Sequence, residues 1–369
     1  MRILILGGGV IGTSLAYHLA ARGADVTVLE RNAIACAASG KSGGFLALDW
    51  CDGTALMSLA RRSFALHAEL AAALGGDWGY RRMTTYAGTV GRSPIRMRGA
   101  GPGWISSNVV INGQLGSTST TAQVHPAAFT SGMMRAAEER GAKVLLGQAE
   151  GLLRRDADVI GVQFEGEALE ADAVVIAMGP WSILAARWVP LPPVFALKGH
   201  SIVFETGATL PSEALFLEYA DSAGSTVSPE VFPRADGTTY VCGISSKSLP
   251  PVDPAFVAPD EGAIDRLKAI CDRMSPVLAR APVLTSQACY RPVTADGLPL
   301  IGRLPGTRGA YVATGHGVWG ILNAPATAEA MAELILDGEP RRIDLSPFDP
   351  ARLAALDPER VTVTRRLRG

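Results

Sequence analysis

The sequence predicts an α/β protein in which a parallel-sheet domain is combined with an inserted, largely antiparallel α+β domain. Within residues 1–20, an apolar run, a glycine-rich turn and an amphipathic helix follow one another. Another buried strand, further along the chain at 173–178, also ends in a glycine turn. Between 194 and 242, short apolar stretches alternate with Pro, Gly and Asp, as is typical of antiparallel strands.

The first thirty residues predict a dinucleotide site. The run 1–6 suits a strand buried on both faces of a parallel sheet. In the Gly-x-Gly-x-x-Gly motif that follows, Gly7 permits a tight turn, Gly9 allows the backbone to approach a pyrophosphate, and Gly12 allows close helix packing. Val10 and Ile11 open the helix, whose free N–H groups and positive dipole would face the phosphates.

The second strand, 25–30, ends in an acid that suits the ribose of an adenosine. Glu30 lies 18 positions after Gly12 and can accept hydrogen bonds from the ribose hydroxyls. Arg31 would suit a 2′-phosphate, but a free Glu30 would repel one. The sequence therefore predicts FAD or NAD rather than NADP.

The loop after this strand offers further backbone donors and one positive charge. It directly follows the second strand of the dinucleotide unit, so we expect it to contact the cofactor. Its small and polar residues are Ser39, Gly40, Lys41, Ser42, Gly43 and Gly44.

Composition limits the class of protein. The length of 369 residues favours two domains, and a net charge of −1 with 48% hydrophobic residues excludes disorder and a nucleic-acid-binding patch. No apolar run approaches the roughly 18 residues of a membrane span, and no leader precedes the first strand, so we expect a cytoplasmic protein. The five cysteines and five histidines are scattered, which predicts no disulfide framework and no metal site.

Periodicity predicts the remaining elements. We expect short strands at 78–112, a polar Arg-rich tail from 350, and helices at 56–74, 127–140, 261–274 and 324–336. Further strands are expected at 143–146, 159–164 and 311–314.

The C-terminal half carries a family resemblance. Residues 296–302, 314–321 and the helix 324–336 resemble the FAD-closing segment of the D-amino-acid oxidase superfamily, in its glycine oxidase and sarcosine oxidase branch. Similarity extends to Gly7–Gly12, Glu30, the region of Val144, 175–181 and 290–336. Residues 39–47 and 229–234 also resemble uncharacterised oxidoreductases of the superfamily.

This resemblance implies an FAD-binding Rossmann-like domain that is discontinuous in sequence. The substrate domain would be inserted into it, and the flavin ring would reach across to this second domain. The implied division gives 1–50, 127–190 and 286–340 to the FAD-binding domain, 51–126 and 191–285 to the substrate domain, and 341–369 to a C-terminal tail.

The resemblance also implies contacts with a non-covalent FAD. The backbone at Val144 would meet the adenine, and the closing turn would place N–H donors at the flavin's pyrimidine end. No cysteine lies between 315 and 323, and Cys289 belongs to a different segment, which indicates non-covalent attachment. The other implied contacts are Gly179, Trp181, Gly315, Gly317, Val318, Trp319, Gly320 and Ile321.

The implied reaction is oxidation of a C–N bond by hydride transfer to flavin N5, followed by imine hydrolysis. Arg291, in Tyr-Arg-Pro, resembles the arginine that holds the substrate carboxylate in glycine oxidases. A second arginine of some relatives is replaced here by Val318 and Trp319. Oxygen or an electron carrier would accept the electrons.

Four further residues are candidates for a catalytic role, and each could instead have a purely structural role. His316 and His200 could handle protons, or simply form packing hydrogen bonds. Lys41 and Lys198 could place a charge near the reduced flavin, or lie on the surface.

Three other functions remain open. The flavoenzyme could act on an unrelated biosynthetic amine or alcohol, or the chain could be a non-catalytic FAD-binding assembly protein. A nicotinamide-dependent dehydrogenase fits the first thirty residues but leaves the closing segment unexplained.

Overall fold

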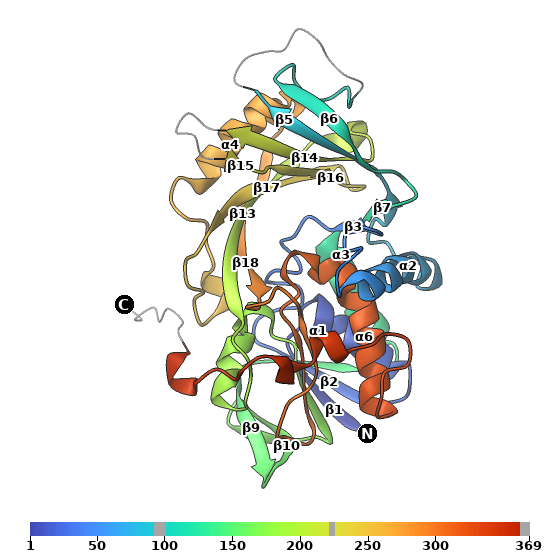
Figure 1. Ribbon diagram of the computed structural model, residues 1–369, viewed down its shortest axis with the longest axis vertical. Helices are drawn as coiled ribbons and strands as arrows, with labels where there is room; N and C mark the ends of the chain where they lie inside the picture. The colour runs from blue at the N-terminus through green and yellow to red at the C-terminus, as the bar shows by residue number, and fades with distance from the viewer. Residues whose placement is uncertain (92–100, 221–225, 362–369) are drawn as a thin grey trace.

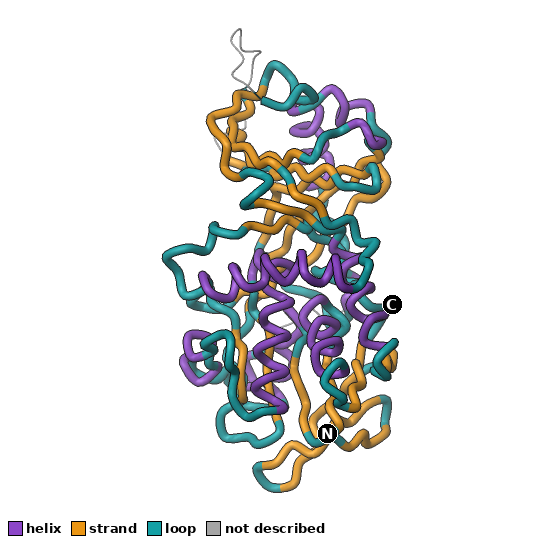
Figure 2. Tube along the Cα trace, turned by 90° about the vertical axis from the view of Figure 1, so that its right-hand side faces the viewer, coloured by secondary structure: helices purple, strands orange, loops and turns teal. Residues whose placement is uncertain are grey.

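The computed structural model describes residues 1–91, 101–220 and 226–361. The molecule is elongated, with two parts stacked along its long axis (Figures 1 and 2). The part with the N-terminus holds the parallel sheet and most helices, and the other part holds a large, mostly antiparallel sheet. The predicted fold class is confirmed.

The parallel sheet is the predicted Rossmann-like sheet. Its order is β19-β20-β12-β1-β2-β8, and all neighbours are parallel except the pair β19 and β20. The predicted strands in this region are confirmed. Their bounds are β1 Arg2–Leu6, β2 Asp25–Glu30, β8 Lys143–Leu146, β12 Ala173–Ile176 and β20 Ala310–Thr314, and the sheet also contains β19 Leu300–Arg303, which was not predicted as a strand.

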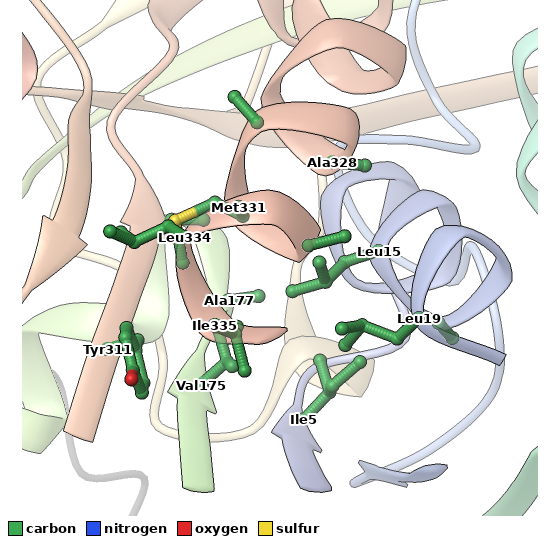
Figure 3. Close-up of a cluster of buried hydrophobic side chains, with 14 of the residues drawn as sticks. Ile5, Leu15, Leu19, Val175, Ala177, Tyr311, Ala328, Met331, Leu334 and Ile335 are labelled. Atoms are coloured by element: carbon green, nitrogen blue, oxygen red, sulfur yellow. The ribbon is translucent and has the colours of Figure 1, made fainter. Parts of the chain in front are cut away.

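Helices cover one face of this sheet and a small sheet covers the other. Apolar side chains of α1 and α6 meet those of β1 and β12 in the core drawn in Figure 3, where Leu15 and Leu334 lie above Ile5 and Val175. The opposite face packs against the three-stranded sheet β11-β10-β9. The elements are α1 Val10–Ala20, α2 Met57–Ala73, α3 Pro126–Glu138, α6 Gly320–Leu336, β9 Ala149–Arg155, β10 Asp158–Phe164 and β11 Glu167–Glu170.

Helix α6 contains a proline, and α2 compensates for it. Pro325 has no N–H to donate to the carbonyl of Ile321, four residues earlier. The buried His67 of α2 donates from Nε2 to this carbonyl instead, at 2.9 Å. Ser63, one turn earlier in α2, accepts from the N–H of Ala326 at 2.9 Å. Burial lowers the pKa of His67 to about 4, so the ring stays neutral and keeps its single proton on Nε2.

The second part is a sheet of eight strands that curves over the first. Its order is β18-β13-β17-β16-β14-β5-β6, with β15 beside β14, and only β14 and β5 run parallel. Helix α4 packs against its outer face, with α5 beside it. The bounds are β5 Thr84–Val90, β6 Val109–Gly116, β13 Phe195–Glu205, β14 Glu213–Ala220, β15 Thr226–Val227, β16 Glu230–Pro233, β17 Thr238–Ser246, β18 Val283–Val293, α4 Ala263–Met274 and α5 Pro276–Arg280.

A small three-stranded sheet links the two parts. Its strands are β3 Phe45–Ala47, β7 Thr121–Gln123 and β4 Arg81–Arg82, in the order β3-β7-β4. The short strands expected at 78–112 correspond to β4, β5 and the start of β6, while 92–100 lie outside the described residues.

The predicted division into domains stays a prediction, but one boundary crosses a strand. Strand β18 begins at Val283 and pairs with β13 from Phe204 to Phe195. Residues 286–293 therefore pair within the large antiparallel sheet, whereas the expected range 286–340 gives them to the FAD-binding domain.

The expected tail is packed against the body of the protein as far as Val361. Ile343 and Phe348 are buried in the core of the parallel sheet. Arg352 donates to Asp296 Oδ2 at 2.7 Å and to the Leu298 carbonyl at 2.7 Å. The sequence did not predict that this stretch packs against the protein, because its composition is polar. A few apolar side chains and one arginine are enough to hold it in place.

Replacing Arg352 by alanine should therefore produce a pH-dependent loss of stability. The Arg352 hydrogen bond lowers the pKa of Asp296 to about 2, below its value in the unfolded chain. The pair thus stabilises the fold at and above about pH 4, and this contribution is lost as the pH falls towards the folded-state pKa. We expect a free energy of unfolding about 1 kcal/mol lower at neutral pH, and a difference that shrinks between about pH 5 and pH 2.

Urea unfolding at several pH values measures this difference. Arg341→Ala is the matched control, because Arg341 makes a long 3.6 Å ion pair with Asp337 and its side chain is 66% exposed. A loss for Arg352→Ala that stays constant with pH would contradict the assignment to Asp296.

In the described part of the chain, none of the helices has the length and apolar character needed to cross a bilayer. All five cysteines are free thiols.

Candidate active site

A cavity of about 860 Å³ lies between the carboxyl ends of the parallel strands and the large antiparallel sheet. At one end it is lined by the first glycine turn and by residues 147–150. At the other end it is lined by side chains of β16, β17 and β18. One continuous space therefore joins the dinucleotide motif to the antiparallel sheet.

The glycine turn needs its glycines. Gly7 has a φ of +114°, and a Cβ there would lie 2.5 Å from the carbonyl oxygen of Ala177. A Cβ on Gly12 would lie 2.0 Å from the Gly7 carbonyl oxygen, so Gly12 permits α1 to pack on the turn. On Gly9 a Cβ would face Ser39 Oγ at 3.1 Å. The contacts of Gly7 and Gly12 agree with the tight turn and the close helix packing that the motif predicts, and the approach of Gly9 to a pyrophosphate stays a prediction.

Neighbouring side chains hold this turn in place. Glu30 accepts from the N–H of Gly8 at 2.7 Å and from the N–H of Asn32 at 3.0 Å. Ser39 Oγ accepts from the N–H of Val10 at 2.8 Å. Arg31 donates to the Val252 carbonyl at 2.6 Å, which ties it to the antiparallel part.

Most of the predicted site residues line the cavity, and five do not: the four named next and Lys198. Gly12 and Gly40 do not line it, and a Cβ on Gly40 would be 2.1 Å from the Ala35 carbonyl oxygen. Val144 and His200 do not line the cavity either. Residues 147–150 line the end of the cavity where we expected the backbone at Val144 to meet the adenine. The lining residues are Gly7, Gly9, Val10, Ile11, Glu30, Arg31, Ser39, Lys41, Ser42, Gly43, Gly44, Gly179, Trp181, Arg291, Gly315, His316, Gly317, Val318, Trp319, Gly320 and Ile321.

Two helix N-termini open onto this cavity. Val10 and Ile11 begin α1, and Gly320 and Ile321 begin α6. The first turn of a helix has backbone N–H groups without intrahelical partners, together with a positive dipole end. The cavity thus offers donors for a pyrophosphate at α1 and for a negatively charged ring at α6, which fits FAD.

The two candidate histidines make internal hydrogen bonds. His316 lies 3.1 Å from Thr327 Oγ1, and burial lowers its pKa to about 3. His200 contacts the Ile244 carbonyl at 3.1 Å through Nδ1 and accepts from the N–H of Asp260 at 3.1 Å through Nε2. His316 is therefore neutral at ordinary pH, and His200 is not brought to the cavity.

Of the two candidate lysines, one lines the cavity and the other does not. Lys41 lines the cavity. Lys198 forms an ion pair with Asp260 at 2.5 Å and does not line the cavity.

Arg291 reaches into the cavity across the neighbouring strand. From β18 its guanidinium passes over Gly199 of β13 and donates to Ser245 Oγ of β17 at 3.2 Å. A Cβ on Gly199 would lie 3.4 Å from Arg291 Cζ. Gly199 therefore leaves the space that the guanidinium occupies, a role that only the pairing of β13 with β18 discloses.

Replacing Gly199 by valine should displace this guanidinium. The added side chain extends from the one point where Arg291 crosses β13. We expect a KM for a carboxylate substrate that is roughly tenfold higher, because Arg291 loses its alignment, with FAD content unchanged. Steady-state kinetics and the flavin-to-protein absorbance ratio measure the two effects. Gly113→Val, the same change in β6 at a glycine that does not line the cavity and has no atom within 4 Å of the position of a Cβ, is the control. An unaltered KM would contradict this role of Gly199.

A wall of aromatic rings lines the cavity beside Arg291. Adjacent rings in this wall have centroids 4.9 to 6.3 Å apart. Burial raises the pKa of the tyrosine hydroxyl in the wall well above 10, so it stays protonated. The sequence does not single out these rings as a group, because they come from separate segments: Phe45, Trp50, Phe216, Phe232, Tyr240 and Trp319.

Glu230 is the acidic side chain beside this wall. It lines the cavity from β16, and its Oε2 accepts from the thiol of Cys242 at 3.5 Å. Burial raises the pKa of Glu230, and the charge of Arg291 partly opposes this shift. In the described ranges no ion pair within 4.0 Å joins Glu230 and Arg291. Sequence reasoning placed Glu230 in a stretch of family resemblance, 229–234, but gave it no role.

Fold and site together are those of a dinucleotide-binding protein whose large antiparallel sheet covers the far end of the cavity. The chain matches the model of the DAO family, FAD dependent oxidoreductase, over residues 2–334, and it belongs to this family. It is an FAD-dependent oxidoreductase, and the glycine turn, Glu30 and the two helix N-termini are the features that fit this cofactor.

Relatives and solved structures agree with this assignment. A Schizosaccharomyces pombe protein provisionally named an oxidoreductase is 31% identical, with 94% of this chain and 97% of the relative aligned. Glycine oxidase of Bacillus licheniformis is 29% identical over 96% of this chain and 98% of its own. The crystal structure of glycine oxidase from Bacillus cereus has the same fold, with a TM-score of 0.77, 23% identity, and coverage of 92% of this chain and 98% of its own.

Proposed function

We propose that this enzyme oxidises a C–N bond of an amino acid or an N-substituted amino acid. The observation that supports this most is the position of Arg291. Its guanidinium lies at the end of the FAD cavity, on the antiparallel sheet, with a serine hydroxyl as its hydrogen-bond partner. A carboxylate can take two parallel hydrogen bonds from such a group.

Each part of the cavity would then have a task. Bound FAD supplies a two-electron acceptor for the hydride of the substrate carbon. Arg291 holds the carboxylate and so fixes which carbon faces the cofactor. The aromatic wall excludes water from the amine, and the N–H groups at the start of α6 stabilise negative charge on the cofactor side.

We propose that FAD is held without a covalent bond. Cys36 and Cys289 line the cavity, but burial raises the pKa of both thiols, that of Cys289 to about 11. Protonated thiols are poor nucleophiles. Acid precipitation of the purified protein should therefore leave all the flavin in the supernatant, as measured by its visible absorption. Flavin that stays with the pellet would contradict this proposal.

The substrate test is an anaerobic titration of the holoenzyme followed by visible absorption. Small amino acids, their D-forms, their N-methyl derivatives and the matching 2-hydroxy acids are added one at a time. Bleaching of the flavin bands by an amino acid and not by its hydroxy analogue supports the proposal. Flavin bands that resist every amine would contradict it.

A second candidate is oxidation of an amine or alcohol that is not an amino acid. Val318 and Trp319 favour it, because they stand where some relatives have a second arginine, and both line the cavity. Bleaching by hydroxy compounds alone in the same titration would favour this candidate.

A further inference from the structure

We propose that Glu230 binds the ammonium group of the substrate and removes its proton before oxidation. This inference rests on the proposed function and deepens it, because it narrows the substrate class to zwitterionic amino acids. Arg291 would bind the carboxylate of such a substrate, and Glu230 would bind its ammonium group.

In the described part of the chain, the Glu230 carboxylate lies beside the cavity with only a weak hydrogen-bond donor. Glu230 stands opposite Cys242 on β17 and opposite Phe216 on β14, and all three line the cavity. Among the described residues, the thiol of Cys242 is the hydrogen-bond donor to this carboxylate. A thiol is a weak donor, so the carboxylate retains capacity to accept from a stronger one.

Glu329, a buried carboxylate, shows the contrast with the partly buried Glu230. Glu329 accepts from Arg62 at 2.9 Å and from Arg342 at 2.8 Å, as is usual for an acid inside a protein. Glu230 has no such cation within ion-pair distance in the described residues. A substrate cation would supply the missing partner.

Glu230 and Arg291 together match the two charges of an amino acid. They lie on strands at either side of β13 and β17, and both line the same cavity. They influence each other electrostatically without forming an ion pair. The aromatic rings beside them, Phe216 and Phe232, have faces that also attract a cation.

The proton transfer completes the chemistry of amine oxidation. An ammonium nitrogen has no lone pair to stabilise the positive charge that develops when hydride leaves the adjacent carbon. When the N–H bond breaks and the proton passes to Glu230, an O–H bond forms and the amine gains its lone pair. Bound FAD would supply the acceptor for the hydride and its two electrons, as in the proposed function.

The surroundings of Glu230 favour its protonated form after this transfer. The titratable or charged groups that face it are Cys242 and Tyr240 on β17 and Arg291 on β18. Burial keeps the thiol and the phenol protonated, so neither competes for the proton. Glu230 is thus the acceptor that this cluster provides.

The first test measures binding without turnover. The holoenzyme is titrated with 2-aminoisobutyrate, a zwitterion that has no α-hydrogen to lose, and with pivalate, in which a methyl group replaces the ammonium. The shift of the flavin absorption bands reports binding. Wild type should prefer 2-aminoisobutyrate, and Glu230→Gln should lose roughly tenfold or more of this preference. Glu218→Gln, a change in the exposed glutamate of β14, should leave it unchanged.

The second test is the pH dependence of flavin reduction by the best amine substrate. In wild type the rate should be nearly constant above neutral pH, because Glu230 takes the proton. In Glu230→Gln the rate should fall about tenfold for each pH unit below the pKa of the free amine and approach wild type above it. A merely structural loss would lower the rate equally at every pH.

The outcomes separate this inference from the function on which it rests. Failure of wild type to prefer 2-aminoisobutyrate, or an unchanged preference and pH profile in Glu230→Gln, would overturn the role of Glu230. A normal binding preference without bleaching by any amine would instead overturn C–N oxidation and leave the ammonium site standing.

Discussion

Replacing Arg291 by alanine is expected to raise the KM for the carboxylate substrate by about 100-fold while FAD stays bound. The change removes two charge-assisted hydrogen bonds, each with a contribution of about 1.5–3 kcal/mol. The guanidinium crosses β13 and contacts Ser245, so it lies on the antiparallel sheet and far from the glycine turn in sequence. Steady-state kinetics measures KM, and the visible absorption of the purified variant measures bound flavin.

Two further variants sharpen this result. Arg291→Lys keeps a positive charge but cannot donate in parallel to both carboxylate oxygens, so we expect an intermediate KM. Arg154→Ala is the matched control, because Arg154 donates to the Trp188 carbonyl at 2.7 Å and does not line the cavity. An alanine variant at 291 with wild-type KM would exclude Arg291 from substrate binding.

Replacing Gly7 by alanine is expected to abolish FAD binding. The residue has a φ of +114°, and its new Cβ would lie 2.5 Å from the backbone oxygen of Ala177. The Cβ is fixed by the backbone of the turn, and the oxygen belongs to the backbone that follows β12, so one of the two segments must move and the N–H groups of the turn would leave their positions. The variant should purify without the yellow flavin colour, which the ratio of visible to ultraviolet absorbance measures.

Gly23→Ala is the matched control for this change. Gly23 has a φ of +80°, and no atom lies within 4 Å of the position of a Cβ. This variant carries a backbone penalty of about 1 kcal/mol without the collision, and should retain FAD. A Gly7→Ala protein with full flavin content would show that the turn tolerates displacement.

The sequence was sufficient to predict elements whose structure depends on residues that are neighbours along the chain. The strand, turn and helix of residues 2–20 were predicted almost to the residue, because apolar runs and glycines act locally. Helix α2 was predicted within one residue at each end for the same reason. The closing segment was found through family resemblance, and all of its predicted residues from 315 to 321 line the cavity.

Features that depend on distant pairing escaped prediction. Strand β18 runs past the expected boundary at 286 because β13 pairs with its whole length. The roles of Gly199 and Glu230 depend on which strands are neighbours, and neither residue carries a local signal. Helix α6 begins at Gly320, four residues before the expected start, because side chains of α2 hydrogen-bond to the backbone groups around Pro325.

The support that α2 gives to α6 has an evolutionary consequence. Pro325 leaves the Ile321 carbonyl without a partner, and His67 and Ser63 supply hydrogen bonds on either side of this gap. In homologues with a residue other than proline at this position, the helix closes its own hydrogen bonds, and selection on these two α2 positions relaxes. The three positions are therefore expected to covary across the family, although 258 residues separate the histidine from the proline.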